Sequence, residues 1–245
     1  MLEQNQIYLG DCLELMKDIR DKSIDLILCD LPYGTTKCKW DTVIPLEPLW
    51  KQYNRIIKDS GAIVLFGSQP FTSTLIMSNI KDFRYEIIWE KTMPTLFQHA
   101  NKRPMLKHEN IVVFYKKQPT YNPQFSEGEP YTRKEGSGNR KVSGFHGNAI
   151  KKSEIKNEGK RYPTTILKYS NGNHNRLHPT EKNIELLEWL IKTYTDENEI
   201  VLDNCMGSGS TIVACKNTNR NYIGIEKDEH YYNIAYNRIN GYIYE

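Results

Sequence analysis

The first part of the chain, up to residue 116, alternates short apolar runs with amphipathic stretches. Continuous apolar runs of this length are typical of strands that are buried on both faces of a sheet. We expect such strands at residues 24–29, 62–66, 85–89 and 111–115. Between them, apolar residues recur at helical spacing over 46–57, and a short helix is expected over 11–19.

The same alternation returns after residue 176. Ile184, Leu187, Ile191 and Tyr194 lie on one face of an expected helix that Thr180 can cap. A strand over 200–203, a helix, a strand over 222–226 and a last helix from about 228 to 240 follow. Strands separated by helices predict a mostly parallel α/β sheet that is covered on both faces.

Between these two parts, residues 117–176 lose the pattern. They are rich in Gly, Asn, Ser, Pro, Lys and Arg, with only scattered aromatic residues. A segment of this length is too long for an ordinary loop. We therefore predict three parts: a first part of the main domain over 1–116, an inserted module over 117–176, and the rest of the main domain over 177–245. A solvated, flexible insertion without function is the alternative.

Charge is distributed unevenly along the chain. The whole chain has a net charge of +3, but residues 116–182 hold 14 Lys and Arg against 6 Glu and no Asp. This segment therefore carries +8 and the rest carries −5. A basic segment on an acidic body is the asymmetry that attracts a polyanion such as a nucleic acid.

Several classes of protein are disfavoured by composition. No apolar stretch reaches the roughly 20 residues of a membrane span, and the N-terminus lacks the apolar core of a signal peptide. We expect a cytoplasmic protein with no membrane partner. The five cysteines are an odd number and form no C-x-x-C pair, which predicts neither a disulfide framework nor a zinc site, and thus no metal.

The expected strand over 200–203 runs into a loop of small residues that contains Gly207 and Gly209. Such a loop before a helix lets a ligand approach the backbone at the carboxyl edge of a sheet. Glu226 ends the next strand, 19 residues after Gly207, about the spacing of an acidic residue that binds ribose. The loop lacks the lysine of a P-loop, and Ile212 replaces the third glycine of a dinucleotide site. The pattern favours a nucleoside-type cofactor without pyrophosphate over a tight turn without ligand.

A second motif, Asp30-Leu31-Pro32-Tyr33, directly follows the buried strand over 24–29. Because proline stiffens the turn, the Asp30 carboxylate and the Leu31 carbonyl can be held as paired acceptors. An exocyclic amino group offers two donors in nearly that geometry, and Tyr33 offers a flat face on which a base can stack. Taken alone, the motif also fits an ordinary turn after a strand.

Together the two motifs resemble those of the amino-group DNA methyltransferases, whose usual forms are D-P-P-Y and D-P-F-x-G-S-G. His178-Pro179-Thr180-Glu181-Lys182 resembles the H-P-T-x-K segment of that family, and Gly10-Asp11 its early G-D segment. The catalytic motif comes before the cofactor motif, as in the β-class. The resemblance implies a Rossmann-like S-adenosylmethionine-dependent methyltransferase sheet in circularly permuted motif order, with an inserted target-recognition region.

The same resemblance assigns roles to individual residues. The catalytic group would be Asp30, Leu31, Pro32 and Tyr33. The S-adenosylmethionine site would be formed by Asp11, Cys12, Asp30, Thr180, Lys182, Asp203, Cys205, Met206, Gly207, Ser208, Gly209, Ser210 and Glu226. Two departures stand out: Leu31 replaces the first proline, and Asn204-Cys205 replaces Pro-Phe, which removes an aromatic wall.

For DNA, the resemblance makes the insertion the target-recognition region. The basic residues expected to contact phosphates there are Arg133, Lys134, Arg140, Lys141, Lys151, Lys152, Lys160 and Arg161. Trp40, shortly after the catalytic motif, either holds the extruded base or packs against the sheet.

The resulting prediction is a site-specific DNA methyltransferase of restriction-modification type that acts on N6 of adenine. Asp at position 30 favours adenine, since family members that act on cytosine N4 more often begin the motif with serine. Cytosine-N4 methylation, RNA adenine-N6 methylation and a catalytically silent nucleic-acid-binding protein are the alternatives. C5-cytosine methylation is disfavoured, because it needs a cysteine nucleophile. In the family of those enzymes that cysteine follows a proline, and no cysteine of this chain does. A monomer and a homodimer both stay open, and a prokaryotic or phage origin is expected.

Overall fold

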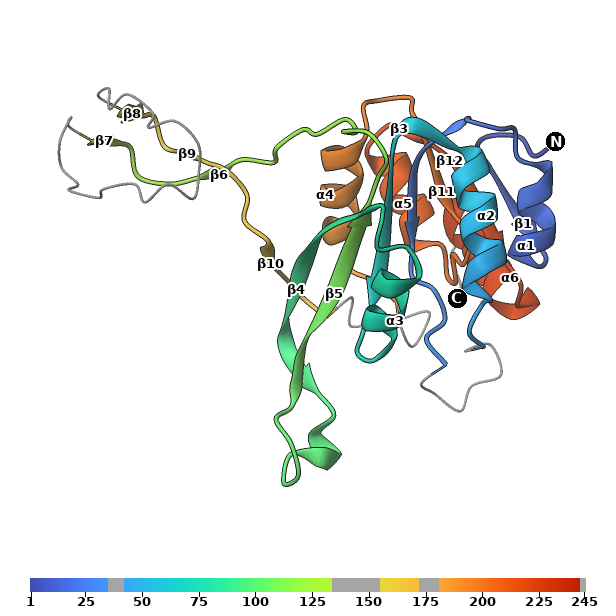
Figure 1. Ribbon diagram of the computed structural model, residues 1–245, viewed down its shortest axis with the longest axis horizontal. Helices are drawn as coiled ribbons and strands as arrows, with labels where there is room; N and C mark the ends of the chain where they lie inside the picture. Colours follow the sequence, from blue (N-terminus) through green and yellow to red (C-terminus); the bar gives the residue numbers. More distant parts are fainter. Residues whose placement is uncertain (35–41, 134–154, 172–180, 243–245) are drawn as a thin grey trace. The chain divides into compact units, whose positions relative to one another are not determined.

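A computed structural model describes residues 1–34, 42–133, 155–171 and 181–242 of the chain, without the side chains of Arg133 and Ile155. The chain divides into two compact units (Figure 1). The larger unit comprises residues 1–122 and 165–245, and the smaller unit comprises residues 123–164.

Eight strands of the larger unit form one sheet, in the order β1-β12-β11-β2-β3-β5-β4-β10. In this order the strands are β1 (Gln6–Leu9), β12 (Asn221–Glu226), β11 (Ile200–Asp203), β2 (Ile24–Cys29), β3 (Ile57–Gly67), β5 (Leu106–Phe114), β4 (Phe83–Thr95) and β10 (Ile166–Tyr169). β5 is antiparallel to both neighbours, and the other pairs are parallel. The mostly parallel sheet that the sequence predicts is confirmed.

Helices cover both faces of this sheet. They are α1 (Cys12–Leu15), α2 (Leu46–Ile56), α3 (Phe71–Ser78), α4 (Ile184–Tyr194), α5 (Ser210–Asn217) and α6 (Glu229–Ile239), with 3-10 turns η1 (Met16–Asp18) and η2 (Phe97–His99). Side chains of the central strand β2 alternate between two apolar cores. Leu26 and Leu28 pack in the core with α4, α5 and α6, whereas Ile27 and Cys29 pack in the core with α1, α2 and α3.

Several details differ from the sequence-based expectation, which did not include the helix α3. The N-cap of α4 is Asn183, whose side chain accepts a hydrogen bond from the Leu186 N–H at 3.0 Å, so the expected cap at Thr180 is wrong. β10 was not expected, because it lies in the segment 117–176 that lacks an apolar pattern. This short edge strand pairs with β4 and buries a single apolar side chain, Leu167, which leaves no periodicity to read.

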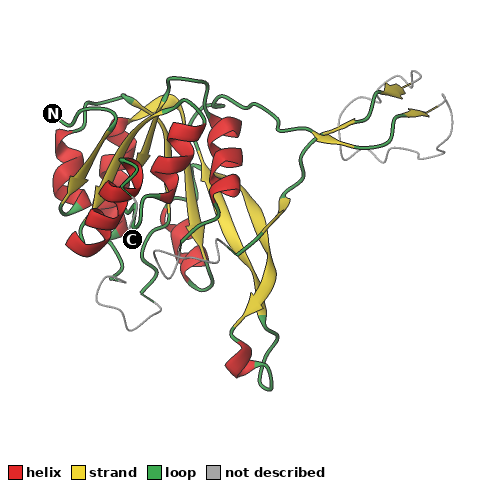
Figure 2. Ribbon diagram, turned by 180° about the vertical axis from the view of Figure 1, so that it is seen from behind, coloured by secondary structure: helices red, strands yellow, loops and turns green. Residues whose placement is uncertain are grey.

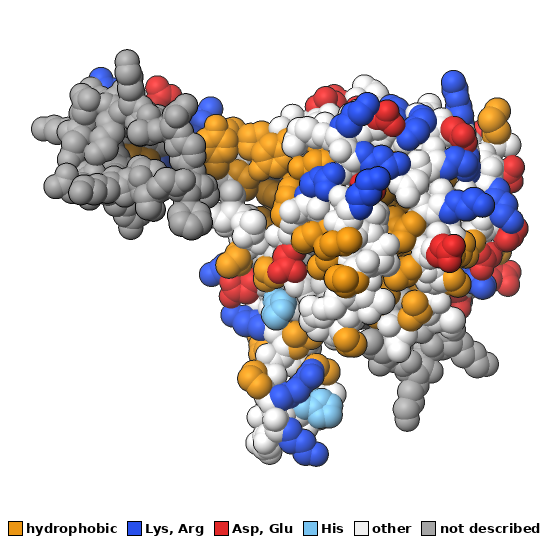
Figure 3. All heavy atoms as spheres, in the orientation of Figure 1, with side chains coloured by type: hydrophobic (Ala, Val, Ile, Leu, Met, Phe, Trp, Pro, Cys, Tyr) orange, Lys and Arg blue, Asp and Glu red, His pale blue; other side chains and the backbone are white. Residues whose placement is uncertain are grey.

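The hairpin of β4 and β5 extends beyond the helices that cover the sheet (Figure 1). Its residues between Lys91 and His108 contain three further basic side chains and no acidic one. Lys102, Arg103 and Lys107 are all exposed, and Figure 3 shows Lys, Arg and His side chains gathered there. Phe97, at the tip, is 79% exposed.

The described part of the smaller unit contains two short antiparallel pairs of strands (Figure 2). β6 (Ser126–Glu127) pairs with β9 (Lys160–Arg161), and β7 (Tyr131–Arg133) pairs with β8 (Ile155–Asn157). Phe125 packs on Tyr162 with ring centroids 4.7 Å apart. No described residue of this unit belongs to the buried apolar core. Local hydrogen bonds and ring contacts, rather than a core, hold the described part together.

Candidate active site at the carboxyl edge of the sheet

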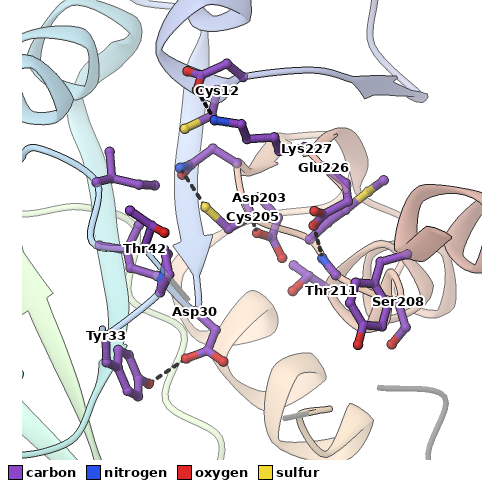
Figure 4. A pocket seen from close by; sticks show the side chains of 18 of the residues that line it. Cys12, Asp30, Tyr33, Thr42, Asp203, Cys205, Ser208, Thr211, Glu226 and Lys227 are labelled. Atoms are coloured by element: carbon purple, nitrogen blue, oxygen red, sulfur yellow. Dashed lines mark hydrogen bonds and ion pairs between the residues drawn. The ribbon is translucent and has the colours of Figure 1, made fainter. Parts of the chain in front are cut away.

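The loops after β1, β2, β11 and β12 line one cavity of about 390 Å³ (Figure 4). These strands are parallel, so their carboxyl ends meet at one edge of the sheet. A cavity of this volume is large enough for a small-molecule ligand. The predicted site residues that line it are Asp11, Cys12, Asp30, Leu31, Pro32, Tyr33, Lys182, Asp203, Cys205, Met206, Gly207, Ser208, Ser210 and Glu226. The structure thus brings the two motifs of the sequence to the same cavity.

Glu226 is fixed by backbone donors at both carboxylate oxygens. The Gly207 N–H donates to Oε2 and the Asp228 N–H donates to Oε1, each at 2.8 Å. Burial raises the pKa of Glu226 above its usual value. Gly207 and Glu226, 19 residues apart in the sequence, are therefore in direct contact. This contact holds the carboxylate at the cavity wall.

Asp203, at the end of β11, is 3% exposed. Its carboxylate accepts hydrogen bonds from the Cys205 N–H at 3.1 Å and from the Thr211 hydroxyl. Burial raises the pKa of Asp203 to about 6. Its hydrogen-bond partners are all uncharged, so this buried carboxylate is suited to balance a cation in the cavity.

Gly209 does not line the cavity among the described residues, unlike the other predicted glycine. It is the N-cap of α5 at a φ of +79°, a conformation that side chains disfavour. A Cβ at this position would lie 3.1 Å from the Cβ of Ala235 on α6. Its observed place is in the turn and in the packing of α5 against α6.

Asp11 is the N-cap of α1 and accepts from the Leu13 N–H at 2.9 Å. Its other oxygen forms an ion pair with Lys227 Nζ at 3.0 Å. Hydrogen bonding to Lys227 lowers the pKa of Asp11. At this end of the cavity, the Asp11 carboxylate thus caps α1, is ionised and is open to solvent.

Asp30 directly follows β2 and has a partner at each oxygen. The Tyr33 hydroxyl donates to Oδ1 at 2.5 Å, and Lys182 Nζ donates to Oδ2 at 2.6 Å. The Tyr33 ring also stacks on Phe71 with centroids 5.1 Å apart. Burial raises the pKa of Asp30, and Lys182 opposes that rise. The turn is therefore held by its own tyrosine and by a lysine from a distant segment.

Two residues that the sequence analysis missed lie behind Asp30. Glu109 on β5 pairs with Lys182 at 3.2 Å and also with Lys91 on β4. Neither residue belongs to a recognised motif, and both reach the site through the antiparallel pairing of β5 with β4, which lies next to the edge strand β10. Other lining residues that were not predicted include Val43, Ile44, Pro45, Thr211 and Tyr231, which belong to no motif.

Asn204 and Cys205, the departures from the family motif, form a small polar network. The Tyr53 hydroxyl donates to Asn204 Oδ1 at 2.6 Å, and Asn204 Nδ2 donates to Cys205 Sγ at 3.5 Å. The thiol of Cys205 also contacts Cys12 and Cys29. Burial raises the pKa of Cys29 to about 12, so this thiol stays protonated. The described residues form no group of His, Cys, Asp and Glu that could hold a metal ion.

Most of the residues predicted to bind DNA are outside the described part of the chain. Trp40, Lys134, Arg140, Lys141, Lys151 and Lys152 are in this group, and so is Thr180 of the predicted cofactor site. Arg133 ends β7, and Lys160 on β9 is exposed. Arg161 donates to the Asn157 side chain and to the Glu129 carbonyl, and lies over the Tyr131 ring at 5.0 Å. It therefore supports the smaller unit itself.

The cavity suits S-adenosylmethionine by the chemistry of its walls. In such a complex Asp203 would offer a carboxylate to an ammonium group, and Glu226 would offer carboxylate acceptors to ribose hydroxyls. Met206, Val43 and Ile44 add apolar surface to the cavity wall. The donors and acceptors present thus match a cationic nucleoside without phosphate.

Comparison with known proteins gives the class. Residues 24–237 match the N6_N4_Mtase family of DNA methylases, so the chain belongs to that family. It is 29% identical to the type II methyltransferase M.BglII of Bacillus subtilis, over 97% of this chain and 69% of that protein. It is 26% identical to the type II methyltransferase M1.MboII of Moraxella bovis, over 96% of each.

Solved structures agree with this assignment. The complex of M1.HpyAVI with S-adenosylmethionine superposes with a TM-score of 0.67 at 25% identity, covering 96% of this chain and 98% of that one. The cytosine-N4-specific PvuII DNA methyltransferase shares the fold, with a TM-score of 0.68 at 17% identity, covering 98% and 94%. The predicted fold class, a Rossmann-like methyltransferase sheet, is confirmed. None of the described helices is long and apolar enough to cross a membrane.

Proposed function

We propose that this protein transfers a methyl group from S-adenosylmethionine to N6 of adenine in DNA. The main support for this proposal is that Asp30 lines the same cavity as the loop of Gly207 and the carboxylate of Glu226. A hydrogen-bond acceptor for an amino group and a site for a nucleoside cofactor therefore share one space. Membership of the DNA methylase family supports methyl transfer as the reaction.

In the proposed reaction the protein positions an amino group and accepts its hydrogen bonds. One N–H donates to the Asp30 carboxylate and the other to the Leu31 carbonyl. These bonds favour a pyramidal nitrogen whose lone pair points toward the cofactor end of the cavity. S-adenosylmethionine, when bound, supplies a methyl group on a sulfonium leaving group. As the N–C bond forms, the S–C bond of the methyl group breaks and the amino group loses one proton to water. Positioning and electrostatics lower the barrier.

Adenine is the proposed base because position 30 is aspartate. The M1.HpyAVI complex with S-adenosylmethionine and the cytosine-N4-specific PvuII enzyme both share this fold. Cytosine N4 is therefore the second candidate, and the motif residue favours adenine over it.

DNA is the proposed partner, and the basic residues of the smaller unit support this assignment. The exposed Lys102, Arg103 and Lys107 of the β4–β5 hairpin add positive charge on the larger unit. Basic side chains of this kind contact phosphates without reading sequence. The target base must leave the duplex to reach a cavity of this kind. We propose a cytoplasmic enzyme, encoded by a prokaryote or a phage, that acts on DNA.

The test is the identity of the methylated base, read by mass spectrometry of nucleosides from treated duplex DNA. Detection of N6-methyladenine supports the proposal. If only N4-methylcytosine is found, cytosine rather than adenine is the target base. Exclusive methylation of RNA, or cofactor binding without any transfer, overturns the proposal.

Asp30→Asn tests the assigned acceptor. The variant should lose about a hundred- to a thousandfold in turnover, much more than it loses in cofactor affinity. Asp59→Asn is the matched control, since Asp59 pairs with Lys22 and Lys117 on the surface. Near-normal turnover by Asp30→Asn would contradict the assignment.

A further inference from the structure

A chain of four alternating charges runs from β4 to the catalytic turn. Lys91 Nζ pairs with Glu109 Oε1, whose carboxylate pairs through Oε2 with Lys182 Nζ at 3.2 Å. Lys182 in turn donates to Asp30 at 2.6 Å. The chain ends at the carboxylate that lines the cavity.

This chain of charges is mostly removed from water. The side chains of Lys182, Lys91 and Glu109 are 9%, 12% and 14% exposed, and Asp30 is 22% exposed. Taking charges out of water is costly, and apolar residues of similar volume often stabilise a fold as well or better. Stability alone is therefore a weak reason for the chain. Its open end at Asp30 points to a role in the reaction.

Glu109 competes with Asp30 for one ammonium group. Lys182 Nζ lies between the two carboxylates, at 2.6 Å from Asp30 and 3.2 Å from Glu109. It also lies over the Phe66 ring, 5.1 Å from the centroid, which leaves it little room to turn away. Without Glu109, the whole charge of Lys182 would act on Asp30. A carboxylate that is so strongly paired is a weaker acceptor for a substrate N–H.

We propose that Glu109 is a positioning residue, which shares the Lys182 ammonium with Asp30 so that Asp30 stays an effective acceptor. Lys91 forms an ion pair with the other oxygen of Glu109, and this pairing determines how strongly Glu109 attracts the ammonium group of Lys182. This proposal rests on the proposed function, in which Asp30 accepts from the target amino group. It assigns a role to Glu109 and Lys91, which belong to neither the catalytic turn nor the cofactor loop.

Electrostatics give the proposal a directional signature. The titratable groups that act on Asp30 are Tyr33, Lys182, Glu109, Cys29 and Asp203. Burial is the largest cause of the raised pKa of Asp30, Lys182 lowers that pKa, and Glu109 raises it. Removing the charge of Glu109 must therefore lower the pKa of Asp30. Removing Lys91 must raise it, because Glu109 then draws Lys182 more strongly.

The experiment is the pH profile of kcat at saturating cofactor and duplex DNA. Glu109→Gln should shift the acid limb to lower pH by about one unit and lower the plateau kcat about tenfold, with KM for the cofactor unchanged. Lys91→Gln should shift the acid limb to higher pH by a smaller amount. The double variant restores the local charge balance, which protects folding, and its limb should lie between those of the single variants.

Glu90→Gln is the matched control. Glu90 lies on β4 next to Lys91 but pairs with Lys107 and Lys168 at the surface. Its profile should match that of the parent protein. Coincident acid limbs for all the variants, or shifts of the same sign for Glu109→Gln and Lys91→Gln, would overturn the proposal. That result would leave the assignment of Asp30 intact, since only the Asp30→Asn variant tests it.

Discussion

The two ends of the cavity hold their carboxylates by different means. At the cofactor end, Glu226 accepts hydrogen bonds from the Gly207 and Asp228 N–H groups, and Asp203 accepts from the Cys205 N–H as well as the Thr211 hydroxyl. At the catalytic end, Asp30 is held by the side chains of Tyr33 and Lys182, and Lys182 is shared with Glu109.

The two kinds of partner suit the two ends to different functions. Backbone donors are fixed by the fold and do not titrate, so they give a cofactor a rigid frame. Paired side-chain charges balance one another, so a change in one alters the proton affinity of the next. The cofactor end is therefore suited to binding, and the catalytic end is suited to an acceptor whose strength must be set.

The strongest way to break the catalytic end is Lys182→Met. The variant leaves Asp30 and Glu109 as buried anions with only Lys91 to balance them, and losing one partner of a buried pair costs about 3 kcal/mol or more. We expect the free energy of unfolding to fall by about that amount in urea titrations. A change below about 1 kcal/mol would contradict a buried charge chain.

A pH titration sharpens the contrast from the cofactor end. Asp203 must be ionised to balance an ammonium group, and its pKa is about 6. Cofactor affinity, measured by calorimetry, should therefore fall about tenfold for each pH unit below about 6. Asp203→Asn should bind weakly at every pH, without this slope. An affinity that is constant from pH 7 to 5 would contradict the role of Asp203.

The same group predicts the pH dependence of stability without cofactor. The folded pKa of Asp203 lies above its model-peptide value of 3.8, so the native state binds the proton more tightly than the unfolded state. Through this group, the free energy of unfolding falls by up to about 3 kcal/mol as pH rises from about 4 to about 6. Asp203→Asn should lose this part of the slope.

The smallest effect is expected from Lys227→Met, the cofactor-end counterpart of Lys182→Met. Lys227 is 77% exposed where it pairs with Asp11, and exposed ion pairs contribute less than about 1 kcal/mol. We expect an almost unchanged free energy of unfolding, with the pKa of Asp11 rising toward its usual value in an NMR titration. A loss comparable to that of Lys182→Met would erase the distinction between the two ends.

The cofactor end could be predicted from the sequence because its residues lie in loops directly after adjacent strands. Gly207 and Glu226 end or follow adjacent parallel strands, so their spacing along the chain predicts their contact. Glu109 and Lys91 carry no such spacing. Their approach to Lys182 depends on the register in which β4 pairs with β5, which no local pattern of residues specifies.

Sequence alone determined the alternation of strands and helices, the order of the two motifs and the small-residue loop before α5. These follow from local physics, since apolar periodicity, turn chemistry and the short reach of backbone hydrogen bonds all act over a few residues. The tertiary structure decided the cap of α4 at Asn183, the edge strand β10 and the charge chain behind Asp30. Each of these depends on which distant segments are packed together, because burial and charge pairing act through space and not along the chain.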